Sequence, residues 1–296
     1  MYCYLLFVFL IISIILFVLY LSIKYKKSKE INNYDYDYIN NENIYIENDN
    51  LVIINEIENE KEDEIEIENV IEIENAKERI PKIIIQTWKT NIIPQRYMKL
   101  INSVKVKNPN YKYLFFTDKD IEEFLKSYYP EYYDTFLKLP KIIQKIDFFR
   151  YISVYHFGGF YLDLDMEVFS SFDNLLHNSC VFPIDEYISK KMCNLMRYNN
   201  YCQREQGFLL GQYAFGAEPK NSFIKLLIDT IDERIDYYIN NFENNSEDYI
   251  YKTTGPDYVT DIYMEYENKN SITILDNGKR QHFGNYAKHK YFGTWK

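Results

Sequence analysis

The sequence has few cysteines, with 4 among 296 residues, and it is also poor in glycine and proline, with 9 and 8. Cys3 lies in an apolar N-terminal run, which leaves Cys180, Cys193 and Cys202 for the rest of the chain. An odd number of cysteines argues against a disulfide framework, although one bridge stays open, and their spacings fit no zinc-binding pattern. We therefore expect these three cysteines to be ordinary buried or free thiols.

An excess of positive charge is also missing, because 44 acidic residues outnumber 34 basic ones. The acidic excess lies in residues 30–79, whereas residues 80–296 hold 27 acidic and 27 basic side chains. A nucleic-acid partner would require a concentrated basic surface. We therefore predict no nucleic-acid partner for this chain.

Charge is absent altogether from Tyr2–Ile23, a run of 22 mostly apolar residues. A helix of this length spans a bilayer core of about 30 Å. The run lacks the short apolar core and the small-residue cleavage site of a secretory signal peptide. We therefore predict a single-pass transmembrane anchor over residues 1–27. The lysines that follow the run favour a cytoplasmic catalytic part by the positive-inside rule, but the side of the membrane stays open.

Residues 28–79 alternate asparagine, aspartate, glutamate and isoleucine. A period of two suits a β-strand, but dense negative charge favours a self-repelling, extended spacer. We interpret residues 28–79 as an acidic low-complexity stem. It would hold a folded domain, residues 80–296, away from the membrane, and that domain is long enough to bury a full core.

Strand and helix patterns alternate through the first half of the predicted domain. Asp118 is a candidate helix cap, and Gly158 with Gly159 ends the helix before the third strand. The last 30 residues look mostly irregular. This order predicts an α/β domain with a largely parallel sheet. The predicted strands cover 83–85, 111–117 and 160–164, and the predicted helices cover 94–107, 119–127, 140–157 and 222–240.

Two carboxylates, Asp163 and Asp165, stand at the end of the third predicted strand. Alternate residues of an extended segment point the same way, so both carboxylates and Tyr161 would face one pocket. Mg²⁺ and Mn²⁺ prefer carboxylate oxygens and commonly bind substrate phosphates as well. A bound metal would offset the charge of a departing diphosphate. An exposed acidic turn is the alternative interpretation, because Asp-x-Asp alone is a weak motif.

The helix before this strand adds Asp147 and Arg150, which are three residues apart and therefore share one helix face. In isolation such a pair is most simply an exposed ion pair that contributes little to stability. Because it lies just upstream of the two aspartates, it could instead receive sugar hydroxyls and a diphosphate.

Four blocks of the chain resemble glycosyltransferase family 32 and its DXD sugar-binding region, typified by the initiating α-mannosyltransferase of yeast. The second block also shares its Asp, Arg and Tyr-x-Asp-x-Asp spacing with the large clostridial glucosylating toxins. The resemblance implies a glycosyltransferase A-type fold, with a Rossmann-like, mostly parallel sheet flanked by helices. It also implies metal-dependent, retaining transfer of a hexose from a UDP- or GDP-sugar to a hydroxyl of a glycan, protein or lipid. The four blocks are residues 80–89, 145–169, 215–227 with 253–260, and 286–296.

The resemblance also implies roles for the five residues of the second block. Asp147 and Arg150 would contact the donor sugar, and Tyr161 the nucleotide part. Asp163 and Asp165 would contact the ribose and a Mn²⁺ or Mg²⁺ ion.

Residues of the other blocks would complete this site. Trp88 would stack on the base, unless it is a core residue, and Trp295 would close over the diphosphate. His289 would complete the metal shell, unless it lies on the surface. Thr254-Gly255-Pro256 matches a family loop near the site, although it could be simply a turn.

Two other functions compete with this one. A phosphatase of the haloacid dehalogenase kind also begins with Asp-x-Asp after a strand, but Glu167 occupies the position where that chemistry usually has threonine or valine. A non-catalytic, membrane-tethered binding protein is the second alternative. For the glycosyltransferase we expect a membrane of the Golgi, the ER or a virus, with a glycan, glycoprotein or glycolipid acceptor.

Overall fold

A computed structural model describes residues 78–241 and 247–293. The predicted anchor over residues 1–27 and almost all of the predicted stem over residues 28–79 lie outside the described residues, as does Trp295. Those three interpretations therefore stay predictions. In the described part of the chain, no helix is both long and apolar enough to cross a bilayer.

The described residues form a seven-stranded sheet with the order β2-β1-β3-β7-β5-β6, and β8 pairs with β5. Strand β1 pairs in parallel with both β2 and β3, while β7 and β6 run opposite to the other five strands. The sheet is therefore mixed, with most strands in one direction, and the predicted α/β class is confirmed. The strands are β1 Ile83–Thr87, β2 Lys112–Phe116, β3 Gly159–Leu162, β5 Cys180–Tyr187, β6 Phe208–Leu210, β7 Ala214–Ala217 and β8 Ile272–Leu275.

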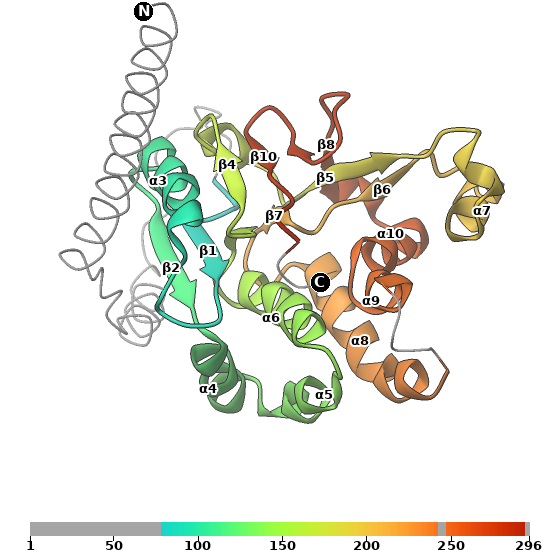
Figure 1. Ribbon diagram of the computed structural model, residues 1–296, viewed down its shortest axis with the longest axis horizontal. Coiled ribbons are helices and arrows are strands. Elements are labelled where there is room, and N and C mark those ends of the chain that lie inside the picture. The colour runs from blue at the N-terminus through green and yellow to red at the C-terminus, as the bar shows by residue number, and fades with distance from the viewer. Residues whose placement is uncertain (1–77, 242–246, 294–296) are drawn as a thin grey trace, which may run out of the picture. The chain divides into compact units, whose positions relative to one another are not determined.

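Helices surround this sheet, and Figure 1 shows α6 and α8 side by side. The predicted cap of α4 is wrong by one residue, because the backbone N–H of Asp120 donates to the hydroxyl of Thr117, and Asp120 in turn accepts from the Thr117 N–H. A threonine hydroxyl and an acidic residue three positions later form such a reciprocal capping box. The helices are α3 Met98–Lys107, α4 Asp118–Tyr128, α5 Tyr133–Lys138, α6 Ile142–Phe157, α7 Met196–Gln203, α8 Ser222–Asn241, α9 Glu247–Thr253 and α10 Pro256–Glu265.

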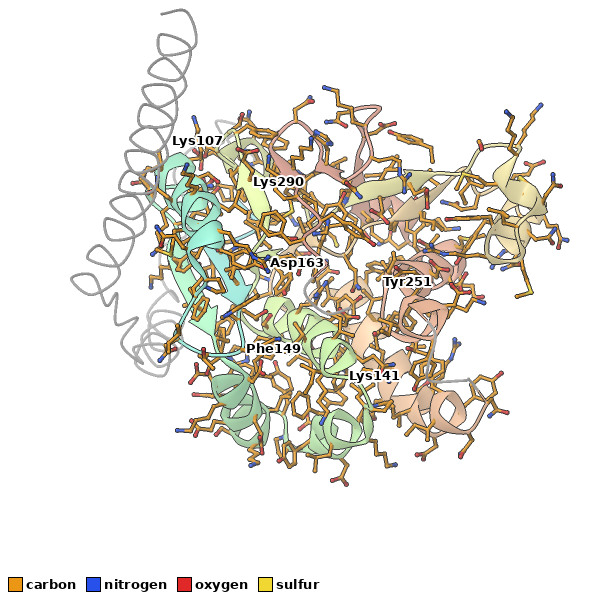
Figure 2. All side chains as sticks on the ribbon, viewed as in Figure 1. Lys107, Lys141, Phe149, Asp163, Tyr251 and Lys290 are labelled. Carbon is orange, nitrogen blue, oxygen red and sulfur yellow. A yellow bond between two sulfur atoms is a disulfide. The ribbon has the colours of Figure 1, made fainter. Side chains whose placement is uncertain are left out.

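The two faces of the sheet are covered by different elements. Ile83 and Ile85 of β1 pack into a cluster with residues of α4, α5, α6, α8 and α10, including Phe149, which Figure 2 labels. Ile84 packs into a second cluster with Val104 of α3. Successive side chains of a strand point to opposite faces, so β1 is buried on both sides, as its continuous apolar run predicts.

The chain near its C-terminus adds a second, three-stranded sheet. Its strands are β4 Met166–Val168, β9 His282–Phe283 and β10 Ala287–His289, and His289 pairs with Met166. Residues 267–293 are mostly turn or irregular, as predicted, but the strands β8, β9 and β10 among them were not predicted. The reason is that the strand partner of β10 comes from a distant part of the sequence, so no local pattern announces the pairing.

A glycine is required where β3 begins. Gly159 has a φ of 84°, and a Cβ atom there would lie 2.4 Å from the backbone oxygen of Ile83. A side chain would therefore be strained and would also collide with β1. The close approach of these two strands places the residues after β3 next to the end of β1.

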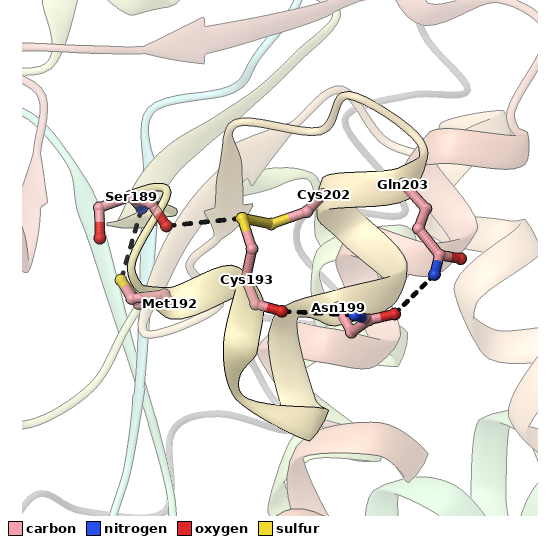
Figure 3. Close-up of a disulfide and its surroundings, with 6 residues drawn as sticks. All are labelled: Ser189, Met192, Cys193, Asn199, Cys202 and Gln203. Carbon is pink, nitrogen blue, oxygen red and sulfur yellow. Dashed lines mark hydrogen bonds between the residues drawn. A yellow bond between two sulfur atoms is a disulfide. The ribbon is translucent and has the colours of Figure 1, made fainter.

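A disulfide joins Cys193 to Cys202, across the turn that leads into α7. Figure 3 shows that the Asn199 side chain donates to the Cys193 carbonyl, at 3.3 Å. Cys180 is free and buried, as predicted. The prediction of ordinary thiols is wrong for the other two, because the chain turns back between Cys193 and the end of α7 and brings the two cysteines within bonding reach.

Candidate active site

Asp163 and Asp165 follow β3 in a tight turn, and Asp163 is labelled near the centre of Figure 2. The Met166 N–H donates to the Asp163 carbonyl at 3.1 Å. The prediction that both aspartates lie in an extended segment is therefore wrong. The turn nevertheless brings both carboxylates to one place, at the carboxyl end of β3, where open α/β sheets bind their ligands.

His289 joins these two carboxylates, because β10 pairs with β4 directly after the turn. Its Nε2 atom lies 3.0 Å from Oδ1 of Asp165, and one ligand atom from each of the three residues lies within 4.8 Å of the others. His289 is buried, which excludes the alternative of a surface histidine. Two carboxylates and an imidazole suit Mn²⁺, and carboxylate oxygens suit Mg²⁺, so these residues fit a divalent cation.

The electrostatics of the cluster favour a positive charge among its members. Burial raises the pKa of Asp163 although Arg150 and His289 oppose this effect. Burial would also raise the pKa of Asp165, but hydrogen bonds from His289 and from the Phe292 N–H hold it below its usual value. Burial would lower the pKa of His289, but the bond to Asp165 and the nearby carboxylates raise it. A protonated His289 or a divalent cation would supply the positive charge.

Arg150 and Asp147 form a buried ion pair beside this cluster. The Arg150 guanidinium lies 3.1 Å from Oδ1 of Asp147 and 3.2 Å from Oδ1 of Asp163, and the two paired side chains are 3% and 1% exposed. This burial excludes the alternative of an exposed helix ion pair. Burial raises the pKa of Asp147 to about 6, although Arg150 and a hydrogen bond from Thr254 act against the rise. Arg150 thus holds two carboxylates, one on its own helix and one after β3.

A cavity of about 620 Å³ opens in front of these residues. Trp88, which follows β1, lines the cavity and is only half-buried, so it is not a core residue. Tyr161 also lines it, donates its hydroxyl to Oδ1 of Asp163 at 3.1 Å, and lies beneath the Arg150 guanidinium. The volume is typical of small-molecule sites. The structure thus brings together every predicted site residue that it describes.

Three further residues contact this site, and sequence reasoning missed two of them, Gln212 and Tyr213. Thr254 donates to Oδ2 of Asp147 at 2.7 Å, so the loop that contains it holds a site carboxylate rather than being only a turn. The Gln212 backbone carbonyl accepts from Arg150 at 3.0 Å, and Tyr213 stacks on His289 with 4.7 Å between ring centroids. Thr254 lies in one of the four family-like blocks, whereas Gln212 and Tyr213 carry no local sequence signal.

Comparison with known proteins agrees with this geometry. Residues 94–182 match the family described as glycosyltransferase sugar-binding region containing DXD motif, and they include the turn with Asp163 and Asp165. Residues 94–182 thus resemble this DXD-containing region, and the predicted resemblance to the family is confirmed. This match favours a glycosyltransferase over a phosphatase or a non-catalytic binding protein.

Individual relatives include two fungal mannosyltransferases. Inositol phosphoceramide mannosyltransferase 3 of Schizosaccharomyces pombe is 38% identical over 122 residues, which are 40% of this chain and 34% of that protein. Initiation-specific alpha-1,6-mannosyltransferase of Candida albicans is 36% identical over 106 residues, which are 33% of this chain and 28% of that protein. The chain thus spans about a third of the length of these relatives. The solved PaToxG glycosyltransferase has 17% identity and a TM-score of 0.44, over 65% of this chain and 73% of that one.

Proposed function

We propose that this chain is a metal-dependent, retaining glycosyltransferase with an A-type fold, which moves a hexose from a UDP- or GDP-sugar to an acceptor hydroxyl. One observation carries the proposal: Asp163, Asp165 and His289 converge beside a cavity of about 620 Å³. The cavity lies at the carboxyl ends of β1 and β3, where a nucleotide-sized ligand is expected.

Asp163, Asp165 and His289 would hold the Mn²⁺ or Mg²⁺ ion. When bound, such a cation offsets the negative charge that develops on the diphosphate leaving group. The protein already orients both carboxylates, because Tyr161 donates to Oδ1 of Asp163 and the Phe292 N–H donates to Oδ2 of Asp165. Each carboxylate therefore has one oxygen held by a hydrogen bond from the protein, and its other oxygen can bind the cation.

The remaining predicted residues would bind the donor. Trp88 would stack on the base and Tyr161 would contact the nucleotide part, and both side chains line the cavity. Arg150 and Asp147 would contact the sugar, and Arg150 would add positive charge near the diphosphate. Trp295, which lies outside the described residues, is proposed to close over the diphosphate.

In a retaining transfer the acceptor hydroxyl attacks on the face from which the nucleoside diphosphate leaves. The leaving phosphate oxygen can take the acceptor proton, so no side chain has to form a covalent intermediate. Asp147 and Asp163 suit orientation better than nucleophilic attack, because both are ion-paired with Arg150. Holding donor and acceptor in reactive geometry is then the main contribution of the chain.

The relatives make mannose the first hexose to test, because their names describe mannosyltransferases. One of those names also specifies an inositol phosphoceramide acceptor, so a glycolipid joins glycans and glycoproteins as an acceptor candidate. A transmembrane anchor over residues 1–27 would bring the domain to a Golgi, ER-type or viral membrane that carries such acceptors. The stem over residues 28–79 would set how far the domain can extend from the membrane.

The test is a donor-hydrolysis screen of the purified full-length protein against UDP- and GDP-sugars, with Mn²⁺ and with EDTA. We expect hydrolysis of one sugar nucleotide that EDTA abolishes and that Asp165→Ala lowers at least about 100-fold. Glu167→Gln is the matched control, because Glu167 pairs with Lys290 on the surface. Near-normal turnover of Asp165→Ala would eliminate the metal role.

A further inference from the structure

A second cavity of about 210 Å³ adjoins the large one. Arg150, Asp163 and His289 line both cavities. The smaller cavity therefore lies next to the proposed metal cluster of Asp163, Asp165 and His289. Its other walls include Asp185 of β5 and Tyr251 of α9, the latter labelled in Figure 2. A group attached to a diphosphate on the metal cluster would therefore extend into this smaller cavity.

One carboxylate with unused hydrogen-bonding capacity lines the small cavity. It is Asp185, to which no hydrogen bond or ion pair occurs among residues 78–241 and 247–293. Asp147 and Arg150 also line this cavity but are already paired with each other, at 3.1 Å. Polar groups in such places are normally satisfied. A hydroxyl-bearing ring in the cavity would supply a donor to Asp185.

The other charged side chains around the small cavity are already paired. Glu186 lies 2.7 Å from Arg280, and the Arg197 guanidinium forms two-pronged hydrogen bonds with Asp257. These two pairs leave Asp185, among the described residues, as a carboxylate wall without a bonded partner, although His289, Arg280 and Arg197 attract its charge. Such a wall disfavours a phosphate and favours the hydroxyl groups of a neutral ring.

Size also favours a single sugar ring. A volume of about 210 Å³ is about a third of the 620 Å³ of the adjoining cavity. It lies below the range of about 300 to 1,000 Å³ that is typical for drug-sized ligands, which favours a single ring over a nucleotide. Asp147 and Arg150 belong to α6, whereas Asp185 belongs to β5. Polar groups on two separate elements can recognise hydroxyls on different edges of one ring.

We propose that Asp185 accepts a hydrogen bond from a hydroxyl of the transferred sugar and thereby determines which sugar this chain transfers. The inference rests on the proposed function and deepens it, because it names a specificity-determining residue in the sugar-binding part of the site. A site built to bind a substrate hydroxyl rejects an analogue that lacks it, because the buried polar group is then left unpaired.

The test compares Asp185→Asn and Asp185→Ala with the wild-type full-length protein. Asparagine keeps the shape of the side chain but loses the charge and replaces one acceptor oxygen by a donor. The matched control is Asp134→Asn, an exposed carboxylate of α5 outside both cavities. The readouts are kcat/KM for donor hydrolysis over a panel of UDP- and GDP-sugars, and the affinity for the free nucleoside diphosphate with Mn²⁺.

We expect kcat/KM for the preferred sugar to fall about 10- to 150-fold in both Asp185 variants, the range for losing a hydrogen bond to a charged group. For a sugar that differs at the contacted hydroxyl, kcat/KM should fall far less in the same variants. The affinity of both Asp185 variants for the nucleoside diphosphate should stay within about twofold of wild type, since a twofold change is a small free energy. Donor hydrolysis by the control Asp134→Asn should also stay within about twofold of wild type.

Three results would overturn the inference, and each is distinct. Unchanged hydrolysis with slower transfer to an acceptor would assign Asp185 to the acceptor instead. An equal loss for every sugar, together with weaker nucleoside diphosphate binding, would indicate a general structural role. If the wild-type protein neither binds nor hydrolyses any sugar nucleotide, the proposed function itself fails and this inference falls with it.

Discussion

Replacing Arg150 with methionine removes the cation that the buried carboxylate Asp147 and the half-buried carboxylate Asp163 share. Methionine keeps much of the length of the side chain without its charge. The lost contacts are the ion pairs at 3.1 and 3.2 Å and the hydrogen bond to the Gln212 carbonyl at 3.0 Å. The cation–π contact with Tyr161, at 4.7 Å from the ring centroid, is lost as well.

The expected cost follows from these distances. At an effective dielectric constant of about 20, each ion pair contributes roughly 5 kcal/mol of Coulomb attraction, and the cost of burying the guanidinium offsets much of it. Breaking a buried pair from one side typically costs about 3 to 5 kcal/mol. We therefore expect Arg150→Met to lower the free energy of unfolding by about 3 to 5 kcal/mol at pH 8.

The loss should depend on pH in a defined direction. Burial already raises the pKa of Asp147 to about 6, and without Arg150 it rises further. The folded variant then binds a proton that the unfolded chain has released, so its stability falls as pH rises from about 4 through the folded pKa. Arg150→Met should therefore be closer to wild type at pH 5 than at pH 8. Asp147→Asn combined with Arg150→Met should recover part of the loss.

Urea-induced unfolding of the full-length protein, measured at pH 5 and pH 8, checks these expectations. Arg204→Met is the matched control, because Arg204 lies 3.9 Å from Glu265 and both side chains are more than a third exposed. Such surface pairs contribute at most about 1 kcal/mol. If Arg150→Met behaves like this control at both pH values, the buried-charge argument is refuted.

Two further stability predictions follow from other parts of the fold. Oδ1 of Asp261 is buried and accepts no hydrogen bond from any residue that the structure describes, and burial raises the pKa of Asp261 from the usual 3.8 to about 6. Asp261→Asn should therefore stabilise the protein by about 1 to 2 kcal/mol above pH 6 and by nothing below pH 4; equal gain at both pH values would contradict this. Removing the disulfide with Cys193→Ser and Cys202→Ser should cost about 2.5 kcal/mol, and hydrogen exchange should speed up in α7 but not in α6. An unchanged rate of hydrogen exchange in α7 would contradict the disulfide prediction.

Local patterns predicted much of the first half of the fold. The apolar run that contains Ile83, the helix that carries Asp147 and Arg150, and the strand before Asp163 occur where the sequence indicates them. These features depend on spacing within one element, which periodicity reports directly. The predictions of the exact cap of α4 and of an extended conformation at Asp163 and Asp165 were wrong. Both features depend on individual hydrogen bonds that a sequence pattern does not specify.

The sequence by itself determined the class of this protein and the residue types of its site, because a carboxylate pair after a strand and an ion pair on one helix face are local features. The resemblance implied that His289 and the loop with Thr254 belong near the site, but only the tertiary structure decided how such distant residues reach it. His289 reaches Asp165 because β10 pairs with β4, and Thr254 reaches Asp147 from a separate loop. Asp185 faces the same cavity from β5. Such contacts form between elements far apart in the chain, and spacing within the sequence carries no record of them.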